Sequence, residues 1–193
     1  MIDKTAVTDH PIEPALAGRW SPRAFAAEMI DDTTTASLFE AARWSPSANN
    51  LQPWAFIHGA RGKQDFDRLL GCLNDSNASW AGNAALLVIG IARSTKADGS
   101  VNAYARYDLG QAVAHLTFQA TALGLHLHQM AGFDREKTRA ELGIPAEYEP
   151  VSAIAIGYLG DPSNLPQPLR DRELATRTRN PTSTFVFPGR WPG

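Results

Sequence analysis

A polar stretch between Trp44 and Trp54 contains side chains that could hold a small heterocyclic ligand. It reads Ser-Pro-Ser-Ala-Asn-Asn-Leu-Gln-Pro and offers hydroxyls, side-chain amides and backbone N–H groups without any charge. A helical pattern precedes the stretch and an apolar run follows it, and loops at such junctions often carry ligand contacts. These residues therefore favour the edge of a neutral heterocycle rich in donors and acceptors. An ordinary helix-to-strand connection capped by Ser and Asn fits the stretch equally well.

Arginines near both ends of the chain could bind an anion. Arg19 and Arg23 flank Ser21, and an extended backbone would direct all three side chains to one side. Arg177 and Arg179 form a second close pair. Arginine suits planar, bidentate recognition of an anion such as a phosphate. Solvated basic segments without a ligand remain an alternative for both places.

Several other kinds of site are not supported. His126 and His128 could ligate a metal from one strand, but no third ligand accompanies them, so no metal site is predicted. The single cysteine, Cys72, excludes an internal disulfide and a multi-cysteine metal centre. No G-x-G fingerprint, Walker loop, nucleophile elbow or H-E-x-x-H motif occurs. No catalytic side chain is predicted, which suits a reaction whose electrons come from a bound cofactor.

The elements that must position these residues alternate between helices and strands. Helices are expected over residues 11–18, 31–44, 63–73, 104–124 and 135–142, strands over 54–58, 84–92 and 151–157, and loops over 74–82 and 93–102. The run over 84–92 is apolar without interruption, as in a strand buried on both faces. The helix over 104–124 is apolar on most sides and is expected in the core or at a subunit interface.

Length and composition indicate one globular domain over residues 1–193. The chain has a net charge of −2, so no general attraction to nucleic acid or to an anionic membrane is expected. No signal peptide is recognisable, and the longest apolar run is too short to cross a bilayer, so a cytoplasmic protein is expected. Residues 161–193, called the arm below, are rich in proline and end near an apolar Phe-Val-Phe. The arm is expected to pack on a partner subunit, with a disordered tail as the alternative.

These segments together resemble the nitroreductase family of FMN enzymes. The family loop A-R-x-[SA]-P-S-x-x-N-x-Q-P-W is matched over residues 42–54, and its opening motif R-x-S-x-[RK]-x-[FY] over residues 19–25. An N-x-x-W motif is similar to residues 77–80, and the turn x-G-F-[DN] to residues 131–134. The arginine pair of the family's C-terminal arm corresponds to residues 177–179.

The resemblance implies an α+β fold with a central mixed, mostly antiparallel sheet flanked by helices and a domain-swapped C-terminal arm. It also implies a homodimer in which the basic opening segment of one subunit and the polar loop of the other share each flavin. The residues that it assigns to FMN are Arg19, Trp20, Ser21, Arg23, Pro46, Ser47, Ala48, Asn50, Gln52, Asn77, Ala131, Gly132, Arg177 and Arg179. Arg19, Ser21 and the arm's pair would hold the phosphate end, whereas Arg23 would lie near the pyrimidine edge.

The expected activity is electron transfer from NADH or NADPH, through FMN, to a nitroaromatic, a quinone or a similar small electrophile by a ping-pong mechanism. Two alternatives stay open. One keeps the flavin but changes the reaction, for example to reductive dehalogenation or to an oxidation. The other is a flavin-binding protein without catalysis, whose arm recruits a partner.

Overall fold

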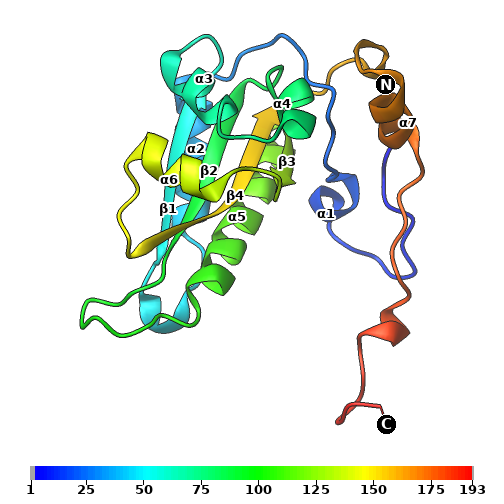
Figure 1. The fold of residues 1–193 in the computed structure, drawn as a ribbon. Helices are drawn as coiled ribbons and strands as arrows, with labels where there is room; N and C mark the ends of the chain where they lie inside the picture. Colours follow the sequence, from blue (N-terminus) through cyan, green and yellow to red (C-terminus); the bar gives the residue numbers. More distant parts are fainter. Residues whose placement is uncertain (1–2, 193) are drawn as a thin grey trace.

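The computed structural model describes residues 3–192, and its centre is a four-stranded sheet (Figure 1). The strands are β1 (Trp54–Ala60), β2 (Leu86–Arg93), β3 (His126–Met130) and β4 (Tyr148–Gly157). Their order is β1-β2-β4-β3, and all three pairings are antiparallel. Strands β1 and β3 therefore form the two edges of the sheet, which matters for the placement of the candidate site.

Helices cover both faces of this sheet. The helices are α1 (Pro14–Gly18), α2 (Asp32–Arg43), α3 (Gln64–Leu70), α4 (Asp75–Ala81), α5 (Ala105–Ala122), α6 (Arg135–Leu142) and α7 (Gln167–Leu174). Strand β2 explains the layering, because Leu86 and Val88 face a core built with α2 and α5, whereas Leu87 and Ile89 face a core built with α3 and α4. The prediction of a doubly buried strand in an α+β fold is confirmed.

Local sequence signals account for the ends of two helices. The side chain of Asp31 accepts a hydrogen bond from the backbone N–H of Thr34 and caps α2. Asp134 caps α6 through the N–H of Lys137, and Gly143 ends that helix with a φ of 62°. These capping interactions follow from neighbouring residues alone, which is why both helix starts were expected.

One segment expected as a loop is helical, and part of the arm is helical too. Residues 74–82 were predicted as a loop, but α4 forms there because the Asn74 side chain caps it and because Trp80 and Ala81 become fully buried. Packing thus outweighs the low helix propensity of Asn, Ser and Asp. Inside the arm, α7 also forms, and the buried Glu173 attaches it to the rest of the chain.

The N-terminal segment and the first part of the arm lie together on the β3 side of the sheet (Figure 1). The N-terminal segment, α1 and α7 stand beside the main body, and the outer part of the arm extends away from it (Figure 1). Phe185, Val186 and Trp191 on this outer part are 62%, 63% and 81% exposed. Packing of the arm on a second subunit stays a prediction. Among the helices of residues 3–192, none is long and apolar enough to cross a membrane.

Candidate functional site

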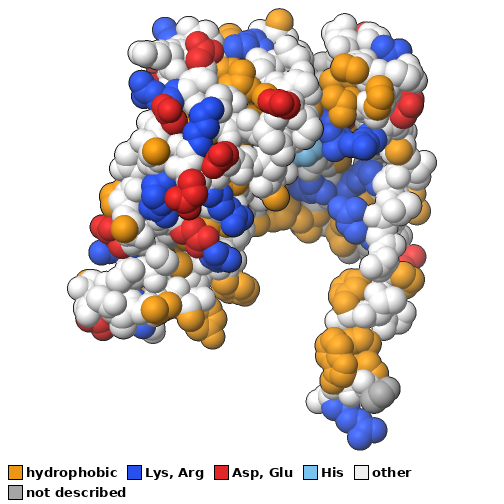
Figure 2. Space-filling view, in the orientation of Figure 1, with side chains coloured by type: hydrophobic (Ala, Val, Ile, Leu, Met, Phe, Trp, Pro, Cys, Tyr) orange, Lys and Arg blue, Asp and Glu red, His pale blue; other side chains and the backbone are white. Residues whose placement is uncertain are grey.

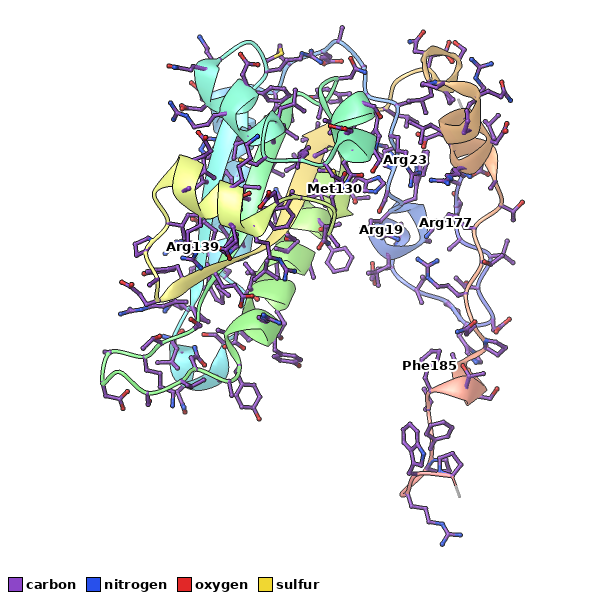
Figure 3. The ribbon with its side chains drawn as sticks, viewed as in Figure 1. Arg19, Arg23, Met130, Arg139, Arg177 and Phe185 are labelled. Atoms are coloured by element: carbon purple, nitrogen blue, oxygen red, sulfur yellow. The ribbon has the colours of Figure 1, made fainter. Side chains whose placement is uncertain are left out.

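A basic hollow lies between the two ends of the chain. It has a volume of about 240 Å³, and Lys and Arg side chains gather where the chain ends face the main body (Figure 2). Its lining residues are Lys4, Arg19, Trp20, Ser21, Arg23, Arg172, Glu173, Ala175, Thr176, Arg177 and Arg179. The structure therefore brings together the two arginine clusters that the sequence placed at opposite ends. Arg19 and Arg177 lie side by side next to α1 (Figure 3).

Backbone carbonyls of the N-terminal segment hold the arm in this position. The guanidinium of Arg177 donates to the carbonyl oxygens of Lys4 and Ala17, the latter at 2.9 Å. The ammonium of Lys4 in turn donates to the carbonyl of Ala175. These contacts bridge more than 150 positions of sequence, so no local pattern could have predicted them.

The hollow concentrates like charges. Burial lowers the pKa of the Arg19 guanidinium, and the nearby charges of Arg177 and Arg179 lower it further. Burial and the charge of Arg179 also lower the pKa of Arg177. Arg19 additionally donates to the hydroxyl of Ser21 at 3.4 Å. Arginines held close together around a hollow with a hydroxyl form a donor set that fits a phosphate.

Glu173 is the only carboxylate among the described residues that line the hollow. It holds residues 19–25, called the opening basic segment below, in place. It is 1% exposed and accepts hydrogen bonds from the backbone N–H of Arg23 at 2.9 and 3.0 Å and from that of Ala24 at 3.0 Å. The guanidinium of Arg23 lies 4.0 Å from the same carboxylate. This role could not be predicted from the sequence, because Glu173 is one of several charged residues in the arm and no spacing distinguishes it.

The opening basic segment also rests on His128 of β3. The His128 ring makes a hydrogen bond of 2.9 Å from Nδ1 to the Pro22 carbonyl and lies 4.6 Å from the Trp80 ring. Burial lowers the pKa of His128 to about 4, with a smaller contribution from the charge of Arg23. The ring is therefore neutral near pH 7, and its Nδ1 must be the donor to the carbonyl. In this structure the histidine works as a support for residues 20–23.

A turn next to this segment brings Asn77 and Gly132 together. The Asn77 amide donates to the Gly132 carbonyl at 2.9 Å. A Cβ atom on Gly132 would approach the amide nitrogens of Asn74 and Asn77 to 2.4 and 2.7 Å, so a larger residue there would force these two side chains to move. Glycine lets both asparagines keep their present positions against the turn. The exposed Ala131 precedes it, and Trp80 on α4 connects the turn to Arg23, whose guanidinium lies 5.9 Å from the Trp80 ring.

The polar loop after α2 has a strained backbone. Asn49, Asn50 and Gln52 have φ angles of 52°, 54° and 48°, and no other non-glycine residue among those described has a positive φ. The Ser47 hydroxyl accepts from the N–H of Gln52 at 3.0 Å, and the Gln52 amide donates to the Asn50 side chain at 3.0 Å. Strain of this kind persists where surrounding contacts enforce it, and it is common in ligand-binding loops.

A buried carboxylate anchors this loop to the main body. Asp108 on the first turns of α5 is 1% exposed, and its Oδ2 accepts from the N–H of Ala48 at 3.2 Å. Pro46 and Asn50 remain exposed on either side of this anchor. The loop is thus held at one fixed place while its polar groups face outward.

Within one chain the polar loop and the basic hollow lie far apart. The loop leads into β1 beside the end of β2, since Trp54 pairs with Ala92. The basic segment lies next to β3, the opposite edge of the sheet, and Phe25 bridges to Leu159 after the end of β4. Figure 1 shows the loop at the lower end of the main body and the chain ends at its side. A single chain therefore places the basic hollow near the Asn77–Gly132 turn, but it does not bring the polar loop to them.

Comparisons with known proteins agree on one family. The model of the nitroreductase family matches residues 16–82 and 73–158. A solved structure described as an oxidoreductase containing FMN is 32% identical and superposes with a TM-score of 0.94, covering 100% of this chain and 99% of the other. An uncharacterised 15.4 kDa protein of Mycolicibacterium smegmatis is 35% identical over an alignment of 144 positions that covers 70% of this chain and 96% of the relative. A Streptomyces coelicolor protein with the provisional name NADH dehydrogenase/NAD(P)H nitroreductase is 25% identical over an alignment of 160 positions that covers 72% of this chain and 78% of the relative.

Proposed function

Since this chain belongs to the nitroreductase family, we propose that it is an FMN-dependent oxidoreductase that passes electrons from NADH or NADPH to a small electrophile such as a nitroaromatic or a quinone. The similar solved structure described as containing FMN supports the choice of cofactor. The provisional name of the Streptomyces coelicolor relative supports a nicotinamide donor. A ping-pong cycle in the cytoplasm, with donor and acceptor using one slot in turn, is part of this proposal.

One observation carries the proposal, namely that Arg19, Ser21, Arg177 and Arg179 surround one hollow although they come from both ends of the chain. The pKa of Arg19 is lowered first by burial and then by repulsion from the charges of Arg177 and Arg179. A bound phosphate dianion would remove that repulsion and accept charge-assisted hydrogen bonds. The residues present therefore fit the phosphate end of FMN.

The remaining contacts assign roles to the chain's own groups. Arg23, held by Glu173 and placed against Trp80, would put a positive charge near the ring edge, where it favours the reduced form of a flavin. Asn77 keeps its side-chain oxygen as an acceptor after donating to Gly132. When bound, FMN itself supplies the hydride and electron chemistry at its N5, so the protein needs to bind, orient and tune it.

We further propose that the functional unit is a homodimer with the flavin at its interface. The polar loop with Ser47 and Gln52 lies away from the basic hollow of its own chain, so only a second copy could place it at the ring. The exposed Phe185 and Val186 on the outer arm support the same arrangement, because they give the arm an apolar surface that a partner could cover.

The decisive experiment is an absorption spectrum of the purified protein after incubation with FMN and removal of free flavin. We expect a yellow protein with bound flavin that is bleached by anaerobic addition of NADH or NADPH and recovers its colour with a quinone or a nitroaromatic. A protein that stays colourless would refute FMN binding. Bound flavin that no nicotinamide reduces would instead point to other flavin chemistry or to a non-catalytic flavin-binding protein.

A further inference from the structure

The N-terminal segment places a buried lysine in the basic hollow. Lys4 lines the hollow together with Arg19, Arg177 and Arg179, and it lies outside the family motifs found in the sequence. It is 9% exposed, although lysine is one of the residues least often buried in proteins. Such burial is stable only where the ammonium has partners. The contacts of the Lys4 ammonium therefore indicate which role this side chain can have.

The contacts of Lys4 hold it in place without neutralising its charge. Its ammonium donates to the carbonyl of Ala175 and lies 5.3 Å from the centre of the Trp20 ring. Its own backbone carbonyl accepts from Arg177. Glu173, the carboxylate that lines the hollow, bonds instead to the backbone of Arg23 and Ala24. An ammonium has three N–H donors, and the carbonyl of Ala175 occupies one of them.

We propose that Lys4 is a direct phosphate-binding residue of the FMN site. This inference rests on the proposed function, and it adds the N-terminal segment as a third wall of the phosphate pocket beside the opening basic segment and the arm. The remaining donors of the ammonium would contact a phosphate oxygen, and the indole of Trp20 would keep the ammonium directed into the hollow. A single charge-assisted hydrogen bond of this kind corresponds to roughly a tenfold to hundredfold change in Kd.

Titration of flavins against variants of the full chain tests this role. We compare Lys4→Gln, which removes the charge, with Lys4→Arg, which keeps it. The control is Lys63→Gln, at an exposed lysine before α3 whose side chain makes no capping bond. Kd is measured by quenching of flavin fluorescence for FMN and for riboflavin, which lacks the phosphate. The measurement with FMN is repeated at several salt concentrations, because screening weakens a charge contact.

We expect Lys4→Gln to weaken FMN binding about tenfold or more, to change riboflavin binding less than about twofold, and to make the Kd for FMN less dependent on salt. Lys4→Arg should retain most of the affinity, and Lys63→Gln should bind as the wild type does. Unchanged FMN affinity in Lys4→Gln, or equal losses for FMN and riboflavin, would overturn the inference. A wild-type protein that binds neither flavin would instead refute the proposed function itself.

Discussion

Replacement of Glu173 by alanine tests how the arm is attached to the opening basic segment. The carboxylate is 1% exposed and accepts from the backbone N–H of Arg23 and of Ala24. Truncation removes these bonds, leaves the buried N–H of Ala24 without its acceptor and takes the negative charge away from Arg23. Breaking a buried pair costs about 3–5 kcal/mol, and an unsatisfied buried N–H costs about 1–3 kcal/mol as part of that sum.

We therefore expect Glu173→Ala to lower the free energy of unfolding by about 3 kcal/mol or more. For a chain of this size, that loss lowers Tm by roughly 10 °C. Glu173→Gln should lose less, because the amide oxygen still accepts but its NH2 group opposes a backbone donor.

Urea unfolding followed by tryptophan fluorescence measures this loss, with FMN left out so that ligand binding does not contribute. Glu28→Ala, at an exposed glutamate, is the matched control and should change stability by no more than about 0.5 kcal/mol. A midpoint and slope for Glu173→Ala equal to those of the wild type would refute the reasoning, because the buried carboxylate would then contribute nothing to holding α7 in place.

Three further substitutions give separate tests. Arg19→Ala should weaken FMN binding about tenfold to a hundredfold in fluorescence titrations, and unchanged affinity would remove Arg19 from the site. Without ligand the substitution should cost little stability, because Arg19 is desolvated and repelled by its neighbours. Gln52→Gly should relieve a φ of 48° and stabilise the protein by ~0.5–1 kcal/mol in urea unfolding, while weakening FMN binding; a loss of stability would contradict the assigned strain. In the unfolded chain His128 gains a proton below about pH 6.5, whereas the folded ring gains one only near pH 4. The wild type should therefore lose about 3 kcal/mol of its free energy of unfolding as the pH falls across that window. His128→Asn should remove this contribution, so that its stability depends less on pH. Equal slopes for variant and wild type between pH 6.5 and 4 would refute this.

Signals that depend on neighbouring residues were readable from the sequence. The apolar run of β2 predicted a doubly buried strand, and Asp31 and Asp134 marked the starts of α2 and α6, because caps and periodicity act over a few positions. Helix α4 was missed for the complementary reason, since it forms around the burial of Trp80 rather than from the propensity of its own residues.

The residue types needed to bind a phosphate and a ring edge were thus set by the amino-acid sequence alone, including the Arg19–Arg23 segment and the polar loop. Tertiary structure decided which of them meet. It placed Arg177 beside Arg19, buried Lys4 and Glu173 in the same hollow, and put the polar loop at the other edge of the sheet. The physical reason is that contacts between residues 150 or more positions apart depend on how the sheet and its covering helices pack, and sequence spacing contains no information about that packing.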